Sequence, residues 1–535
     1  MARLSVLRHL LSNALLGFLL SAGFWTGYGD FGAGLCWLGL VLLIVSSLGA
    51  RPRAAALGGI LSGAVFYAIT LRWIYTVMRV HGGLPAVSAA GVLALIVAAG
   101  SLFFAAFRLG VAWIARPSAA RACLAAPLLW VALEFLRTHL PAIAFPWALL
   151  GYATGGSLAL LQLTSVTGIY GLSFLITAYC AFVAWSVEGL DLQRLSGRFS
   201  LAPTFLLLIV TPLLPAASHI GDRFVPHEQG RHSAHLVQTN FPQSPSYPVD
   251  WMERHATDLD ELDALSIGAT AQKPGLILWP EVPAPFSLQD ARFAARAERI
   301  ARASRNGFLV GVVDWKPGAR GGQAPYNSAA LLDPAGRRVF LYDKIHLVPF
   351  GEYVPLRRWL AFAGKLTVEV GDFQTGSEPK VGQLPGTNER FGVFICFEAV
   401  FPNEVRQFAA KGANVLVNIS NDGWFGRSAA PEQHLMMARV RAVENRRWLL
   451  RATNNGYTVV VDPYGRYTAR MEPDKRGVLS ADYGFRNDLT LYTRWGDWLA
   501  WLCVVGTAGM LIGGAVTSRK PKVKSRTLET KNFRH

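Results

Sequence analysis

The chain has few charged residues and few cysteines for its length. Of its 535 residues, 16% are charged and five are cysteines. Four of them, Cys36, Cys123, Cys180 and Cys503, lie inside apolar runs, where a thiol behaves as a small hydrophobic side chain. Only Cys396 falls in the more polar part of the chain, so that part cannot hold an internal disulfide. Such a lone cysteine is either a core residue or a nucleophile.

Acidic residues are scarce as well. There are 35 of them against 52 lysines and arginines, which gives a net charge of +17. Much of this excess lies in short loops and a C-terminal tail, where it can set the orientation of a membrane protein. No soluble part of the chain shows a basic stripe with interleaved aromatic residues, so we expect no nucleic-acid partner.

Apolar residues, in contrast, make up 52% of the chain and are unevenly spread. Long apolar runs fill the N-terminal part, a region of globular composition follows, and one last apolar run precedes a basic tail. The sequence therefore predicts a membrane domain at 1–220, a globular domain at 225–490, a final membrane helix at 497–516 and a basic tail at 517–535.

The apolar runs predict about eight transmembrane helices, because about 20 mostly apolar residues are needed to cross a bilayer. The predicted segments are 5–23, 31–50, 54–78, 85–115, 122–139, 161–188, 200–217 and 497–516. Seven of them therefore precede the globular domain and one follows it.

The basic residues around these segments predict the orientation. If the N-terminus is cytoplasmic, an even number of segments puts nearly all basic clusters on the same side, as positive charges prefer. These clusters are Arg3 and Arg8, Arg51 and Arg53, Arg116 and Arg121, Arg194 and Arg198, and the tail with Arg519, Lys520, Lys522, Lys524 and Arg526. Arg72 and Arg79 depart from this pattern. The globular domain is then expected on the opposite side of the membrane.

The globular region alternates short apolar runs with helical patterns, which predicts an α/β domain of layered sheets and helices. The expected strands are 235–238, 276–279, 308–313, 328–332, 339–342, 391–395, 415–419 and 458–461, and the expected helices are 252–265, 290–305, 403–411 and 431–447. Turn signals such as Asp333-Pro334-Ala335-Gly336 separate pairs of strands.

Three reactive side chains directly follow apolar strands. Glu281, Lys344 and Cys396 end the runs at 276–280, 339–343 and 391–395, and α/β folds place reactive groups at strand ends. A thiolate is a strong nucleophile, a carboxylate can take the thiol proton, and an ammonium can stabilise an oxyanion. Together they would form a catalytic set for acyl transfer.

Each residue also has an ordinary structural interpretation. Cys396 can be a core residue, Glu281 can begin a helix, and Lys344 can be a surface lysine; spacing alone does not show that the three converge. His232 and His235 have the spacing of metal ligands, but no cysteine or carboxylate cluster completes a site with them. We therefore expect neither a metal nor a cofactor.

Four short blocks carry a more specific signal. They are Trp279-Pro280-Glu281, the run from Tyr342 to Pro355, Ile395-Cys396-Phe397-Glu398, and the run from Asn418 to Gly426. They resemble the signature blocks of the nitrilase, or carbon–nitrogen hydrolase, superfamily. Combined with the membrane segments on both sides, the whole pattern resembles bacterial apolipoprotein N-acyltransferases.

This resemblance implies an αββα sandwich with Glu281 as the base, Lys344 as the transition-state stabiliser and Cys396 as the nucleophile. It implies that an acyl chain passes from a phospholipid, usually phosphatidylethanolamine, through a thioester on Cys396. The acceptor would be the α-amine of the N-terminal S-diacylglyceryl cysteine of an apolipoprotein, in the last step of lipoprotein maturation. The protein would lie in the bacterial inner membrane, with the catalytic domain in the periplasm.

Further positions match the family or depart from it. Glu352 and Glu398 match acidic positions that the family uses near the site. Phe397 stands where tyrosine is common, and Tyr247 stands near where a tryptophan often occurs, which puts details of the substrate pocket in doubt.

Apolar loop residues are candidates for contact with acyl chains. They include Trp359, Trp424 and Phe425, and ordinary core packing is the alternative for each of them.

Two other functions remain open at this point. A membrane-anchored amidase or nitrilase would hydrolyse a small carbon–nitrogen bond with the same three residues, although a small polar substrate needs no bilayer. A transporter or an inactive scaffold is a third possibility. The membrane part has few buried charges beyond Glu134 and Arg108, so it shows no obvious polar pathway.

Overall fold

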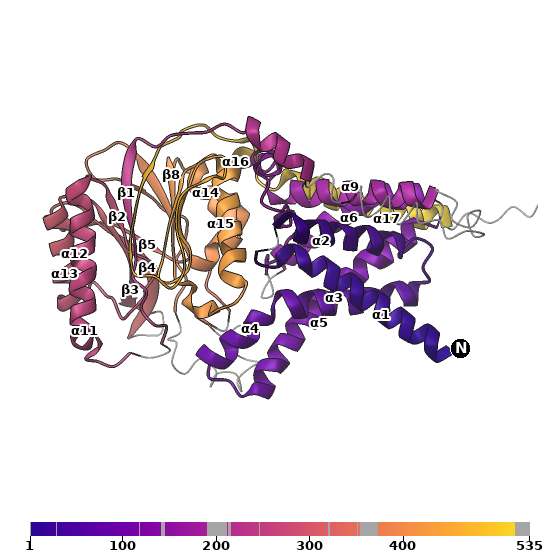
Figure 1. Ribbon diagram of the computed structural model, residues 1–535, viewed down its shortest axis with the longest axis horizontal. Helices are drawn as coiled ribbons and strands as arrows, with labels where there is room; N and C mark the ends of the chain where they lie inside the picture. Colours follow the sequence, from indigo (N-terminus) through magenta and orange to yellow (C-terminus); the bar gives the residue numbers. More distant parts are fainter. Residues whose placement is uncertain are drawn as a thin grey trace, which may run out of the picture.

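The computed structural model divides into a helical half and an α/β half that lie end to end (Figure 1). It describes residues 2–27, 29–116, 118–140, 145–189, 211, 216–244, 247–318, 322–349, 351–353 and 373–518. The N-terminus lies at the end of the helical half that is remote from the α/β half (Figure 1).

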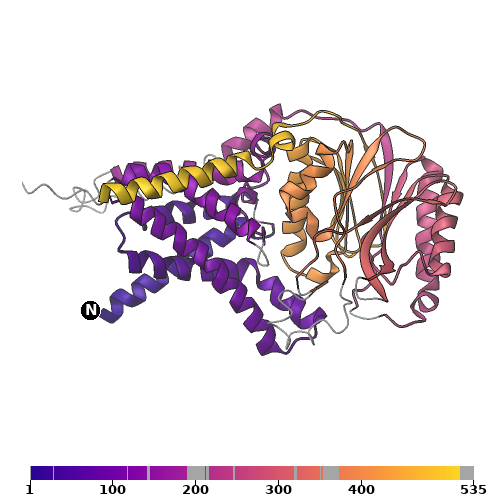
Figure 2. The same cartoon turned by 180° about the vertical axis from the view of Figure 1, so that it is seen from behind.

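The helical half consists mainly of long apolar helices. Their bounds are α1 Ala2–Ser21, α2 Gly29–Val45, α3 Pro52–Thr70, α5 Ala86–Ile114, α6 Ala119–His139, α9 Ile169–Gly189 and α17 Trp498–Ser518. Among the described residues, five helices are long and apolar enough to cross a membrane by length and composition, while the apolar stretches of α2 and α17 are shorter. Figure 2 shows α17 running along the helical half beside helices from much earlier in the chain. The count of eight segments stays a prediction, and most of the predicted segment 200–217 lies outside the described residues.

Two predicted segments are not continuous helices. The segment at 54–78 is broken at Leu71, where the backbone leaves the helical region, and continues as α4 Arg72–Thr76 and the short π-helix η2 Val77–His81. The segment at 161–188 contains α8 Thr164–Thr167, and its long helix α9 begins only after Gly168.

Gly168 has φ of +66°, a left-handed conformation that glycine adopts without strain. An apolar run indicates burial in a bilayer or a core but does not reveal such a break. The predictions of single segments at 54–78 and 161–188 were therefore wrong at Leu71 and Gly168.

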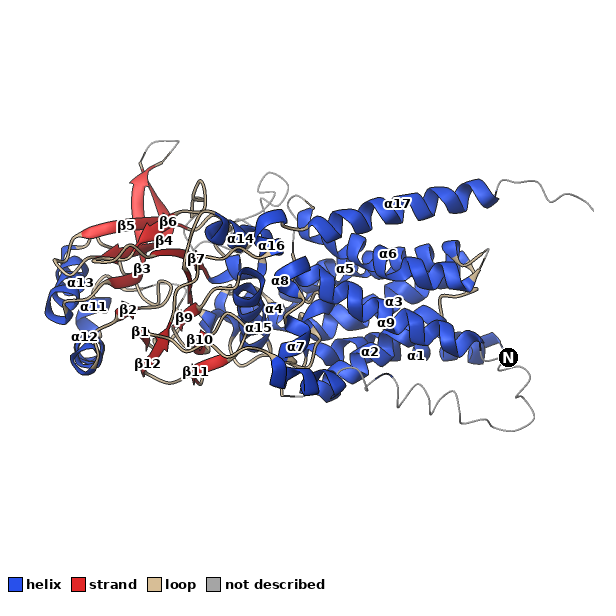
Figure 3. Cartoon of the chain, turned by 90° about the horizontal axis from the view of Figure 1, so that it is seen from above, coloured by secondary structure: helices blue, strands red, loops and turns tan. Residues whose placement is uncertain are grey.

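The α/β half contains two six-stranded sheets in the described residues (Figure 3). The strand order is β12-β1-β2-β3-β4-β5 in one sheet and β11-β10-β9-β8-β7-β6 in the other. The first six strands are β1 His232–Gln238, β2 Leu276–Leu278, β3 Phe308–Pro317, β4 Gln323–Leu332, β5 Arg338–Asp343 and β6 Val381–Gln383. The others are β7 Arg390–Ile395, β8 Val415–Ser420, β9 Leu449–Thr453, β10 Thr458–Val461, β11 Tyr467–Met471 and β12 Gly477–Tyr483.

Helices cover the outer face of each sheet, which confirms the predicted αββα sandwich. Leu262 of α12 (Ala256–Gln272) and Ile300 of α13 (Ala291–Ser304) pack with strand residues of the first sheet in one buried cluster. A second cluster joins the facing sides of both sheets and reaches α14 (Pro402–Ala410) and α15 (Ala430–Asn445). In Figure 1, α14 and α15 lie between the sheets and the helical half.

Helix α15 is apolar on two faces. Leu435, Ala438 and Ala442 pack against the sheet, while Met437 and Val440 belong to the same buried cluster as the membrane helices. Twelve of its 16 residues are buried. The simple amphipathic pattern expected for this helix was therefore incomplete, because a helix enclosed on both sides needs apolar residues on both.

Candidate active site

Cys396 occupies a tight turn between a strand and a helix. Strand β7 ends at Ile395, and Cys396 begins the short 3₁₀ helix η6 (Cys396–Val400). The backbone φ of Cys396 is +48°. A residue with a Cβ atom in the left-handed region costs about 1–3 kcal/mol and persists only where its surroundings enforce it. Such strain is characteristic of functional positions.

Glu281 and Lys344 are buried and form an ion cluster with the partly buried Glu352. The Nζ atom of Lys344 lies 3.1 Å from Oε1 of Glu281 and 3.0 Å from Oε1 of Glu352. The Lys344 side chain is 1% exposed. Burial opposes its charge, but the two carboxylates outweigh that effect and raise the pKa of Lys344, so the lysine is an ammonium.

Two asparagines hold the carboxylates in place. The side-chain amide of Asn327 donates to Oε1 of both Glu281 and Glu352, at 2.7 Å each. The backbone N–H of Asn421 donates to the other oxygen of Glu281 at 2.8 Å. Neither asparagine was identified from the sequence, although Asn421 lies in one of the four blocks. Asn327 lies within β4, beside Lys344, whose N–H donates to the Asn327 carbonyl, and only the pairing of β4 with β5 reveals this.

The Cys396 thiol interacts electrostatically with both members of the pair. Burial and the negative charge of Glu281 raise the pKa of Cys396 above its ordinary value, while the positive charge of Lys344 lowers it. Cys396 is therefore a neutral thiol with an ammonium and a carboxylate nearby. The three residues predicted from strand ends therefore interact electrostatically. The expected distances of about 4–5 Å from the Cys396 sulfur to the Lys344 amine and a Glu281 oxygen stay a prediction.

Glu398 connects the turn at Cys396 to the segment that follows Lys344. One of its oxygens accepts from the Tyr342 hydroxyl at 2.8 Å and the Ile345 N–H at 2.7 Å. The other accepts from the Ile395 N–H at 2.6 Å. Burial raises the pKa of Glu398 to about 7, and these donors oppose the shift. Glu398 therefore fixes the segments that carry Lys344 and Cys396 relative to each other.

Asp422 and His434 form a second polar cluster next to the Cys396 thiol. Cys396, Asp422 and His434 each offer one ligand atom within 4.8 Å of the others, a geometry compatible with a metal ion. However, Arg451 donates to Asp422 at 2.7 Å, and the His434 ring nitrogens already lie 3.1 Å from Asp422 and 3.0 Å from the Cys396 carbonyl. A cation here would lie beside the guanidinium of Arg451. The donor set therefore fits a hydrogen-bonded network, which the sequence did not reveal.

Aromatic rings from both halves of the protein surround the cysteine turn. Phe397 stacks on Phe145 with 6.2 Å between ring centroids. Phe425 contacts Trp73 at 5.1 Å and Trp147 at 5.8 Å. The turn that carries Cys396 thus lies at the junction between the membrane helices and the sandwich.

The other residues predicted to contact substrate contact residues outside the turn at Cys396 or lie outside the described residues. Trp424 contacts His81 of η2, with 5.3 Å between ring centroids. Tyr247 packs against Trp251, and its hydroxyl donates to the Pro283 carbonyl at 3.5 Å, two residues beyond Glu281. Trp359 lies outside the described residues. The roles of these side chains in substrate binding stay predictions.

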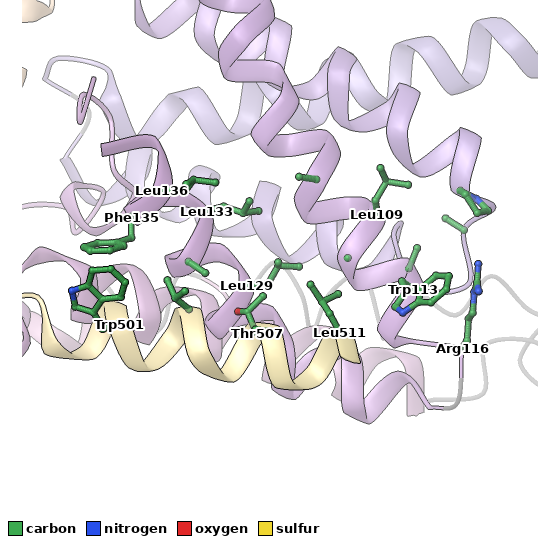
Figure 4. Close-up of a pocket in the computed structure, with 18 of the residues that line it drawn as sticks. Leu109, Trp113, Arg116, Leu129, Leu133, Phe135, Leu136, Trp501, Thr507 and Leu511 are labelled. Atoms are coloured by element: carbon green, nitrogen blue, oxygen red, sulfur yellow. The ribbon is translucent and has the colours of Figure 1, made fainter. Parts of the chain in front are cut away.

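The helical half contains a separate apolar groove. Its volume is about 670 Å³, and it is lined mainly by α5, α6 and α17 (Figure 4). Arg116 lies at one end and Trp501 at the other (Figure 4). Glu281, Lys344 and Cys396 are not among its lining residues, so the groove is not part of the candidate active site.

Comparison with known proteins identifies the family. Residues 12–182 match the apolipoprotein N-acyltransferase N-terminal domain, and residues 236–485 match the carbon-nitrogen hydrolase family. The apolipoprotein N-acyltransferase of Geobacter metallireducens is 35% identical over 479 residues, 89% of each chain, and that of Azotobacter vinelandii is 32% identical over 498 residues, 91% of each chain. A solved amidase from Nesterenkonia sp. is 22% identical, with a TM-score of 0.37, over 52% of this chain and 97% of its own. The chain belongs to the apolipoprotein N-acyltransferase family.

Proposed function

We propose that this protein transfers an acyl chain from a phospholipid to the α-amine of an apolipoprotein through a thioester on Cys396. The observation that carries the proposal is the buried ion pair of Glu281 and Lys344, whose charges both act on the thiol. Family membership supplies the class of reaction. The position of the turn beside the membrane helices fits substrates that are lipids.

In the first step, Glu281 takes the thiol proton while the sulfur attacks the ester carbonyl of the phospholipid. The ammonium of Lys344 stabilises the oxyanion of the tetrahedral intermediate. When the intermediate collapses, the carbon–oxygen bond breaks and Glu281 returns the proton to the departing alkoxide. The products are a lysophospholipid and an acyl thioester on Cys396.

In the second step, the acceptor amine attacks the thioester carbonyl. Glu281 takes a proton from the attacking nitrogen, the carbon–sulfur bond breaks, and the thiolate regains a proton. The acceptor that fits this chemistry is the free α-amine of an N-terminal S-diacylglyceryl cysteine, because its own lipid holds it at the bilayer surface. Phosphatidylethanolamine is the proposed donor.

The aromatic residues around the turn would accommodate the acyl chain. Phe397 and Phe425 come from the sandwich, and Trp73 and Phe145 come from the helical half. An acyl chain that leaves the bilayer would therefore remain among apolar side chains until its carbonyl reaches Cys396.

We also propose that the α/β half lies in the periplasm and that both termini are cytoplasmic. The N-terminus lies at the end of the helical half remote from the sandwich (Figure 1). This supports a topology in which the N-terminus and the sandwich lie on opposite sides of the membrane. Reporter fusions to the C-terminal tail should report a cytoplasmic location. A periplasmic signal from them would contradict the proposed topology of the bacterial inner membrane protein.

The decisive experiment measures lysophospholipid released per enzyme, with and without a diacylated lipopeptide. Without the amine acceptor, the wild-type protein should release about one equivalent of lysophospholipid and then stop, because the thioester on Cys396 persists until an amine attacks it. Release should resume when the lipopeptide is added. Cys396→Ala should release none. Sustained release without an acceptor would instead indicate a hydrolase that uses water.

A further inference from the structure

The carbonyl of Cys396 is contacted by a histidine that takes no part in the proposed chemistry. His434 lies on α15 and is completely buried, and its Nε2 atom is 3.0 Å from the Cys396 oxygen. A contact to a carbonyl at this distance requires that Nε2 carries the proton and donates it. The acceptor belongs to the one residue of the turn that has a left-handed backbone.

Arg451 and Asp422 both lie beside Nδ1, the other ring nitrogen of His434. The guanidinium of Arg451 lies 3.2 Å from Nδ1 of His434 and donates to Asp422 at 2.7 Å. Asp422 also accepts from the Ser420 hydroxyl at 2.8 Å. Nδ1 therefore faces a donor, Arg451, and an acceptor, Oδ1 of Asp422 at 3.1 Å, so its own neighbours do not fix the tautomer. The neighbour of Nε2 is a carbonyl, which can only accept, so Nε2 carries the proton and Nδ1 of a neutral ring keeps its lone pair toward Arg451. Burial and the charge of Arg451 lower the pKa of His434, which keeps the ring neutral.

The ring of His434 is also fixed in orientation. Trp147, which precedes the 3₁₀ turn Leu150–Tyr152 of the helical half, stacks on it at 5.9 Å and 28°. Phe425 packs edge-on at 5.7 Å. The neighbouring Gln433 accepts from the Trp147 indole at 2.7 Å and donates to the Phe24 carbonyl at 2.8 Å. The imidazole is thus held between the two halves of the protein.

We propose that His434 is a positioning residue for acyl transfer: its Nε2–H holds the Cys396 carbonyl and so directs the thiol toward Glu281 and Lys344. In its left-handed backbone conformation, the Cys396 thiol interacts electrostatically with Glu281 and Lys344, and an ordinary helical conformation would turn the side chain elsewhere. Donation to the carbonyl opposes that relaxation. The inference rests on the proposed function of Cys396 as the nucleophile.

A matched pair of amide substitutions tests the donor. In His434→Gln the amide nitrogen lies near the position of Nε2 and can still donate to Cys396, whereas in His434→Asn it lies near Nδ1 and cannot reach. Both variants lose the ring, so their melting temperatures should fall by similar amounts. The glutamine variant should form the acyl-enzyme with phosphatidylethanolamine at least ten times faster than the asparagine variant. Equal rates, or rates that simply follow the melting temperatures, would overturn the proposal.

A third substitution keeps an aromatic ring at this position but removes the hydrogen-bond donor. His434→Phe retains the stacking on Trp147 and the edge-on contact with Phe425, so it should remain folded while acyl-enzyme formation falls at least tenfold. A rate equal to that of the wild type would also overturn the proposal, and this variant decides the matter if the amide variants do not fold.

A second readout does not depend on acyl transfer. The rate at which iodoacetamide alkylates Cys396, followed by mass spectrometry of its peptide, reports the orientation of the thiol directly. The asparagine and phenylalanine variants should differ from the wild type in this rate, and the glutamine variant should resemble it. If the wild-type protein forms no acyl-enzyme, the proposed function fails, while the alkylation comparison still tests the role of His434.

Discussion

Lys344 and Glu281 form a buried ion pair, with 3.1 Å between Nζ and Oε1. The pair contains the proposed base, so Glu281→Gln should reduce acyl-enzyme formation at least about a hundredfold. The same change should lower the pKa of the Cys396 thiol, because the carboxylate that raises it is gone. Mass spectrometry of the protein after incubation with phospholipid measures the first effect, and the pH dependence of alkylation measures the second.

The control for this substitution is an exposed carboxylate. Glu298→Gln on α13 removes a surface charge that pairs only with Arg302 in the described residues, and it should change neither quantity. A similar loss of acylation in both variants, or a rise in the thiol pKa in Glu281→Gln, would argue against Glu281 as the base.

Removing the cation should damage both activity and stability. Lys344→Met keeps the length of the side chain but leaves the buried carboxylate of Glu281 and the partly buried carboxylate of Glu352 without their ammonium. Breaking a buried pair in this way costs about 3–5 kcal/mol. We expect a clear drop in the free energy of unfolding, measured by denaturant titration, together with loss of acyl-enzyme. Full stability in this variant would show that the ion pair is dispensable to the fold.

The thiol of Cys396 should react slowly at neutral pH in the resting protein. Burial raises its pKa above the ordinary value of 9.0. A raised pKa means that the thiolate fraction keeps increasing with pH, so the alkylation rate should rise about tenfold per pH unit from pH 6 to 8.5 without a plateau. Stopped reactions with iodoacetamide at fixed ionic strength test this. A plateau below pH 8 would mean that Lys344 outweighs burial and stabilises a resting thiolate.

Glu398→Gln should weaken the connection between the turn at Cys396 and the segment that follows Lys344. The two carboxylate oxygens accept from the Ile395 and Ile345 N–H groups at 2.6 and 2.7 Å, whereas a glutamine amide has only one oxygen, so one of these N–H groups would face a donor. Leaving such a buried group unsatisfied costs about 1–3 kcal/mol. We therefore expect a lower melting temperature and slower thioester formation. Glu398→Asp, which keeps the charge but not the reach, should fall between the wild type and the glutamine variant in thioester formation.

The sequence predicted the sandwich better than it predicted the helical half. All eight expected strands are present, because each is a short apolar run between turn signals. Strands β6, β9, β11 and β12 were missed. β6 has three residues, and β11 is only partly buried. In the helical half, apolar composition gave the approximate spans but not the breaks at Leu71 and Gly168.

For the candidate site, the sequence indicated residues at strand ends but not the residues that contact them. Glu281, Lys344 and Cys396 each follow a strand, and strand ends are recognisable in a sequence. Asn327 and Arg451 lie inside strands, where a polar residue gives no periodic signal. His434 appears in the sequence as one residue of a helix. Its contact with Cys396 depends on the packing of α15 against η6, which no local pattern encodes.

Helix α15 has a consequence for how the protein is made. Synthesis runs from the N-terminus, so the helices from α1 to α9 leave the ribosome before α15 does. When α15 emerges, the surface formed by Phe24, Trp147 and Tyr152 is already available to one of its faces, and the sheet on its other side still lacks β9 to β11. The membrane half therefore acts as a template on which the catalytic half completes its folding. A sandwich synthesised without that template would present the outer face of α15 to water and to other unfinished chains.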